Sequence, residues 1–100
     1  MLEMIKNLLA PKVGIRIMLR GMFSPQAALT LQNIVRSYNM LGWIQLVQGS
    51  HIMIELEGPR PKLEALLAHL QKTPLSATAT ILDVTWKPYK REFTTFRVSY

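Results

Sequence analysis

The sequence predicts a single α+β domain whose strands and helices follow in the order β-α-β-β-α-β, with one short extra strand at the end. Three observations support this prediction. Two apolar segments with alternating side chains flank a polar break at residues 48–51, which is typical of a β-hairpin. Helical leucine spacing follows the hairpin, and a second helical pattern precedes it. With 100 residues, the chain has room for one hydrophobic core.

The first strand is predicted over residues 13–20, where Val13, Ile15 and Ile17 alternate with other side chains at a period of two. Ser24 and Pro25 then predict the start of a helix, as its N-cap and its first helical residue. This helix is expected to run to Tyr38. Its predicted apolar stripe consists of Ala27, Leu31, Ile34 and Tyr38, with Ala28 and Val35 at its edge.

The hairpin strands are expected over residues 43–47 and 52–56, with Gln45, Glu55 and Glu57 on the face away from the core. We interpret the two glutamates as a solvated edge. Gly58 and Pro59 predict the end of the second strand. A second helix should open at Arg60-Pro61 and close at Thr73-Pro74. Its buried face is predicted to contain Leu63, Leu66, Leu67 and Leu70.

A fourth strand is predicted over residues 78–86, a charged loop over 87–92 and a final strand over 93–100. Two helices on one face of an antiparallel sheet form the ferredoxin-like arrangement, here with a short extra C-terminal strand. The domain is expected to span residues 13–100. Residues 1–12 are interpreted as an amphipathic extension, because Leu2, Ile5 and Leu9 have helical spacing.

Composition narrows the classes of function. The chain has no cysteine, which excludes disulfides, thiolate nucleophiles and thiolate metal sites and is compatible with a cytoplasmic location. The net charge of +6 favours anionic partners, but the basic residues are dispersed, which is more typical of a solvated surface. His51 and His69 stand apart from any cluster of carboxylates, so we expect neither a metal nor a cofactor.

Several segments resemble the acylphosphatase family. Its G-W-V-x-N strand, its G-x-V-x-I-x-x-x-G-P return and its F-x-x-F-x-I ending are matched, in part or fully, by residues 41–44, 52–59 and 93–98. The resemblance covers residues 13–100 and implies the ferredoxin-like fold. It also implies hydrolysis of acyl phosphates, in which loop amides and an arginine hold the phosphate and an asparagine orients the water.

The sequence departs from that pattern at the residues that carry the chemistry. Counted without gaps from Trp43, the family's arginine falls on Ala28 and its asparagine on Leu46. Ser24 and Pro25 stand near the second glycine of the family's phosphate loop, and proline has no amide hydrogen to donate. We therefore expect no catalytic residues, and a domain that has lost catalysis and serves as a binding or protein-interaction module.

The alternative is a hydrolase of acyl phosphates with a non-standard anion site. Arg20, Ser24 and Gln26 are the candidate anion-binding residues, because they flank a helix N-terminus with partial positive charge. The competing interpretation is that Ser24 only caps the helix and Arg20 is solvated. As a module, the domain is expected to bind a protein or to self-associate through residues 1–9, aided by the outward-facing Met18 and Met53. Phosphate or another small anion is the other expected ligand.

Two further classes remain as alternatives. RNA-recognition domains share this element order, but they place aromatic residues on the first and third strands, which here contain none. Blue-light flavin (BLUF) photoreceptor domains share the fold and a similar G-S-H-x-x-x-x-L-E-G-P return, matched here by residues 49–59. Those domains need a tyrosine in the first strand, and residues 13–20 of this chain contain none.

Overall fold

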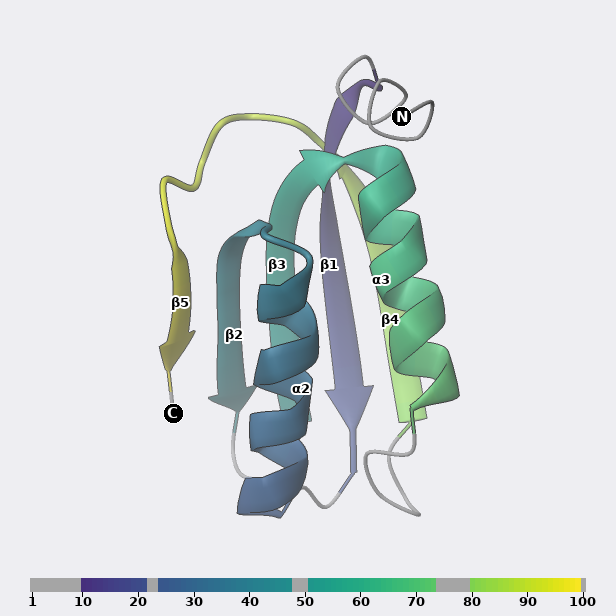
Figure 1. Ribbon diagram of the computed structural model, residues 1–100, viewed down its shortest axis with the longest axis vertical. Coiled ribbons are helices and arrows are strands. Elements are labelled where there is room, and N and C mark those ends of the chain that lie inside the picture. Colours follow the sequence, from purple (N-terminus) through teal and green to yellow (C-terminus); the bar gives the residue numbers. More distant parts are fainter. Residues whose placement is uncertain (1–9, 22–23, 48–50, 74–79, 100) are drawn as a thin grey trace.

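The computed structural model describes residues 10–21, 24–47, 51–73 and 80–99, and these form one five-stranded sheet with two helices on one face (Figure 1). The strand order in the sheet is β4-β1-β3-β2-β5. None of the helices in these ranges is long and apolar enough to cross a membrane. In chain order the elements are β1 (Lys12–Arg20), α2 (Pro25–Ser37), β2 (Leu41–Val47), β3 (His51–Pro59), α3 (Arg60–Lys72), β4 (Thr80–Pro88) and β5 (Phe96–Ser99).

The predicted ferredoxin-like α+β fold is confirmed, including the extra C-terminal strand. The pairs β1–β3, β1–β4 and β2–β3 are antiparallel, as predicted. The extra strand β5 instead runs parallel to β2, with Phe96 opposite Gly42 and Ser99 opposite Gln45. The sheet is therefore mixed. The connection from β4 to β5 passes from one edge strand of the sheet to the other (Figure 1).

The core lies between the sheet and the two helices. Ile15, Ile17 and Leu19 of β1 and Ile52, Ile54 and Leu56 of β3 are almost completely buried there. The helices contribute Leu31, Val35, Leu63, Leu66 and Leu70 to the same cluster. Alternate residues of each strand point to the other side of the sheet, which we call the helix-free face. Met18 and Met53 are register partners on that face, and both are half-buried.

Several predicted boundaries differ from the structure. β1, β2 and β3 begin earlier than predicted, at Lys12, Leu41 and His51, because these residues pair with neighbouring strands. β3 continues through Gly58 to Pro59 because these residues pair with β1, and α3 follows at once. Lys87 and Pro88, predicted as loop, belong to β4 because they also pair with β1. β5 begins only at Phe96, because the amide of Phe93 donates to Glu57 rather than to a strand. Helix α2 ends one residue early, at Ser37.

Some sequence predictions fall outside the described residues. These are the N-terminal helix, the hairpin loop at residues 48–50 and the start of the predicted fourth strand. The same holds for Met22 and Phe23, between β1 and α2.

Candidate functional site

Ser24 and Pro25 shape the start of α2. Ser24 is the N-cap: its Oγ accepts a hydrogen bond from the amide of Ala27 at 3.1 Å, and its carbonyl accepts one from Ala28 at 3.0 Å. Pro25 occupies the first helical position and has no amide hydrogen. The first turn thus directs two of its amides to Ser24. Of the first three helical positions, 25–27, Gln26 is the one whose amide is neither missing nor paired within the described residues.

Arg20 lies at the end of β1, at the same end of the molecule as the start of α2 (Figure 1). It is exposed, it sits opposite His51 and Thr80 in the sheet register, and it forms no ion pair with the other described residues. Gln26 is exposed as well. The structure therefore places the three candidate anion-binding residues at one end of the domain, where helix α2 presents its positive pole.

Ala28 and Leu46 both lie toward the core. Ala28 is buried in the first turns of α2, and Leu46 of β2 packs against the central hydrophobic cluster. At these two positions the described structure offers apolar side chains, with neither a guanidinium nor an amide.

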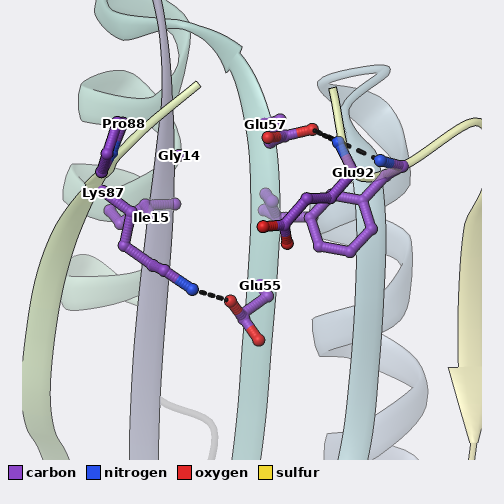
Figure 2. Close-up of a pocket in the computed structure, with 9 residues that line it drawn as sticks. Gly14, Ile15, Glu55, Glu57, Lys87, Pro88 and Glu92 are labelled. Atoms are coloured by element: carbon purple, nitrogen blue, oxygen red, sulfur yellow. Dashed lines mark hydrogen bonds and ion pairs between the residues drawn. The ribbon is translucent and has the colours of Figure 1, made fainter. Parts of the chain in front are cut away.

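A second polar site lies on the helix-free face, and the sequence interpretation missed it. Glu55 and Glu57 are only 8% and 6% exposed, so the expectation that they form a solvated edge is wrong. They are buried because β3 is a central strand, flanked by β1 and β2, and because the β4–β5 connection reaches Glu57. Together with Gly14, Lys87, Glu92 and Phe93 they line a small pocket (Figure 2).

Two basic side chains neutralise Glu55. Lys87 Nζ donates to one carboxylate oxygen at 2.7 Å, and Arg16 donates to the other at 3.2 Å (Figure 2 shows the first). Burial alone raises the pKa of Glu55, but the hydrogen bonds from Lys87 and Arg16 and their charges outweigh it and hold this pKa below its ordinary value. Glu55 is thus the anionic centre of a three-residue ion network.

Glu57 binds the backbone of the β4–β5 connection. Its carboxylate accepts hydrogen bonds from the amides of Lys90 at 3.0 Å, Glu92 at 3.0 Å and Phe93 at 3.4 Å (Figure 2 shows the last two). A carboxylate that accepts several backbone amides is a structural anchor, because it satisfies donors that are otherwise left unpaired. Both glutamates are fully engaged with protein groups, and this arrangement stabilises the sheet rather than offering an acid and a base.

The two histidines lie on different elements, His51 on β3 and His69 on α3. His69 on α3 has its Nδ1 3.1 Å from the hydroxyl of Tyr38 at the end of α2, and the two rings meet edge to face. His51 opens β3. Within the described ranges, no three His, Cys, Asp or Glu side chains gather as metal ligands do. The expectation that the protein uses no metal stays a prediction.

Comparison with known proteins establishes the family. The acylphosphatase family model matches residues 29–98, and the chain therefore belongs to the acylphosphatase family. A curated acylphosphatase of Pyrobaculum islandicum is 29% identical over 80 residues, covering 79% of this chain and 81% of its own. The crystal structure of an acylphosphatase from Bacillus subtilis has a TM-score of 0.70 at 19% identity, and the match covers 88% of this chain and 99% of that one.

The same fold occurs within proteins of other kinds. The BLUF protein BlrB matches with a TM-score of 0.62 at 17% identity, over 91% of this chain and 74% of that one. A full-length HypF structure matches over 91% of this chain but only 12% of its own length, at 20% identity and a TM-score of 0.66. At these identities the likeness is one of fold alone.

Proposed function

We propose that this domain has kept the acylphosphatase fold, has lost the family's hydrolytic chemistry and acts as a binding module in the cytoplasm. The observation that supports this most directly is the closed start of α2. There the Ser24 side chain takes the amide of Ala27, and Pro25 has no amide hydrogen to give. A phosphoryl group needs several free donors at this place.

The two apolar positions support the same proposal. Hydrolysis of an acyl phosphate relies on a positioned guanidinium and a positioned water, since the protein supplies orientation and charge stabilisation rather than a covalent intermediate. If the family's arginine and asparagine correspond to Ala28 and Leu46, this chain has neither the guanidinium that holds the phosphate nor the amide that positions the water. Arg20 is an exposed cation at this end of the domain.

The test is a hydrolysis assay on benzoyl phosphate with the wild-type protein, an Arg20→Ala variant and a Lys72→Ala control. Lys72 is an exposed cation in the last turn of α3, at the same end of the domain as Arg20 but on a different element, so it controls for the loss of one positive charge at this end (Figure 1). We expect no turnover above background for any of the three proteins. Turnover that is lost in Arg20→Ala and retained in Lys72→Ala would overturn the proposal and favour a hydrolase with a non-standard anion site.

A reciprocal experiment asks whether the fold is still competent. The double variant Ala28→Arg, Leu46→Asn restores the two side chains in their family positions. Both positions face the core, so thermal denaturation must first establish that the variant folds. Turnover gained by a folded double variant would support loss of catalysis by substitution of these two residues.

As a module, the domain is proposed to take a protein partner, with a phosphate-type anion near Arg20 as the alternative ligand. RNA and flavin are less well supported. β1 and β3 carry no aromatic residue with which to stack a base, and β1 has no tyrosine.

A further inference from the structure

A groove lies on the helix-free face, where the β4–β5 connection meets β2 and β5. Its volume is about 270 Å³, and it is lined by Gly42, Trp43, residues 92–95 and Arg97. Ile44 lies in the core, so Trp43 points to the other face of the sheet, and Arg97 shares that face as its register partner. We call this hollow the Trp43 groove. Small-molecule pockets measure about 300–1,000 Å³, so a groove of this size suits a small ligand.

Backbone hydrogen bonds hold both ends of one wall of the groove. The amides of Glu92 and Phe93 donate to the carboxylate of Glu57. The amide of Gly42 donates to the carbonyl of Thr95 at 3.0 Å. This part of the β4–β5 connection is therefore fixed against β2 and β3 by the protein itself. A site that is already formed loses less free energy to ordering when a ligand binds.

Two aromatic side chains, Trp43 and Phe93, line the groove. Both are half-buried, so each keeps part of its surface exposed. The rings of Trp86, Tyr89 and Phe96 each have a cation over them. Within the described ranges, Trp43 and Phe93 have neither a cation nor a second ring against them. Aromatic rings pair favourably with one another, so these two favour a ligand with a planar ring.

Arg97 gives the groove a positive charge. It is exposed, and it forms no hydrogen bond or ion pair with any other residue that the structure describes. Arg16 and Arg60, by contrast, each contact a glutamate. Glu92 also lines the groove, but its carboxylate is directed over β3 toward Glu55 (Figure 2). The guanidinium of Arg97 is therefore available to an anionic ligand.

The donors in the groove fit a carboxylate better than a phosphate group. The backbone amides at positions 42, 92 and 93 are already donated to protein oxygens. The guanidinium of Arg97 and the hydroxyls of Thr94 and Thr95 remain. A guanidinium matches the two oxygens of a carboxylate with two parallel hydrogen bonds. A phosphate group instead calls for several backbone amides, and here they are taken.

We propose that the Trp43 groove binds a small aromatic carboxylate, with its ring against Trp43 and Phe93 and its carboxylate on Arg97. This site is separate from the candidate anion-binding residues around Ser24. Trp43 lies near the start of β2, and the start of α2 lies at the opposite end of the domain (Figure 1). The inference therefore holds whether or not the domain hydrolyses acyl phosphates.

The first test is an NMR titration of the whole chain with benzoate. Binding should saturate with a dissociation constant of about 10 mM or below, and the shift changes should centre on the amides of Trp43, Phe93 and Arg97. Benzamide keeps the ring without the charge, and cyclohexanecarboxylate keeps the charge without the aromatic ring. Each should bind about threefold or more weakly than benzoate. Absence of saturation, equal binding of either analogue, or shift changes centred on Arg20 would each overturn the proposal.

The second test removes the charge from the protein. Arg97→Gln should weaken benzoate binding about fivefold or more, because the carboxylate loses its charged donor. Arg91→Gln is the matched control: Arg91 is an exposed arginine on the same connection that does not line the groove. It should change the affinity by less than about twofold, since an exposed charge outside the groove is screened by water and salt. Equal losses in the two variants would mean that benzoate responds only to the net positive charge, and would contradict a site at Arg97.

Discussion

The side chain of Lys87 crosses a neighbouring strand to reach Glu55. Lys87 lies on β4 and Glu55 on β3, with β1 between them, and the ammonium nitrogen is 2.7 Å from the carboxylate. Gly14 of β1 lies beneath this path, and a Cβ added there would lie 3.3 Å from Lys87 Cβ (Figure 2). Three strands are thus joined on the helix-free face by one ion pair, in addition to their backbone hydrogen bonds.

Replacement of Glu55 should destabilise the domain. Glu55→Gln removes the charge that both Lys87 and Arg16 contact, and leaves these cations facing each other at a partly buried site. Because both cations keep contact with water, we expect a loss of about 1–2 kcal/mol in the free energy of unfolding. Urea denaturation measures it. Glu64→Gln, in the exposed pair with Arg60, is the control and should cost less than about 0.5 kcal/mol.

The contribution of Glu55 should depend on pH. Its pKa is lower in the folded state than in the unfolded chain, so the folded protein holds its proton less tightly. Glu55 therefore contributes its full stabilisation at a pH above its pKa in the unfolded chain, about 4.3. This stabilisation is lost as the pH falls through the lower pKa of the folded state. The difference in unfolding free energy between wild type and Glu55→Gln should shrink from pH 7 to pH 3. An unchanged difference would rule out this linkage.

Glu57 is expected to hold the β4–β5 connection. In Glu57→Gln one oxygen remains as an acceptor, but the new amide group brings hydrogens toward backbone donors. We expect this substitution to lower the free energy of unfolding by about 1–3 kcal/mol. Hydrogen exchange should locate the effect: the amides of Lys90, Glu92 and Phe93 should lose protection, because the carboxylate is their acceptor. Retained protection at these three amides would show that other contacts hold the connection.

The environment of these two glutamates marks the limit of what the sequence predicts. Alternation correctly placed Glu55 and Glu57 on the face away from the core, and correctly paired β2 with β3. It did not reveal what covers that face. The partners of Glu57 lie 33 to 36 residues along the chain, and those of Glu55 lie 32 and 39 residues away. Their approach depends on the strand order, which a period-two pattern does not contain.

The same limit applies to β5 and to the start of α2. Apolar alternation predicted a final strand but neither its direction nor its first residue, which follow from pairing with β2. At α2, the N-cap serine and the following proline were read correctly from local rules, because capping involves residues within one turn. Local chemistry was therefore predictable, and contacts between distant strands were not.

Gly42 should be the least replaceable glycine of the sheet. Its φ of 147° is a conformation that residues with a side chain rarely adopt, and an added Cβ would overlap the carbonyl oxygen of Glu55 on β3. Relief would require β2 to move away from β3, which would also disturb the hydrogen bond from the Gly42 amide to Thr95 and the pairing with Phe96. We expect Gly42→Ala to cost roughly 3 kcal/mol or more in the free energy of unfolding.

Gly14→Ala is the matched control for Gly42→Ala, because Gly14 also lies on a central strand with a crowded neighbour. Its added Cβ would meet Lys87 Cβ at 3.3 Å, a contact that a shift of a few tenths of an ångström between β1 and β4 relieves, and its φ lies outside the positive range. Urea denaturation should therefore give a loss below about 1 kcal/mol, arising mainly from the Lys87–Glu55 pair. Similar losses for the two variants would mean that backbone conformation at Gly42 does not govern how β2 packs on β3.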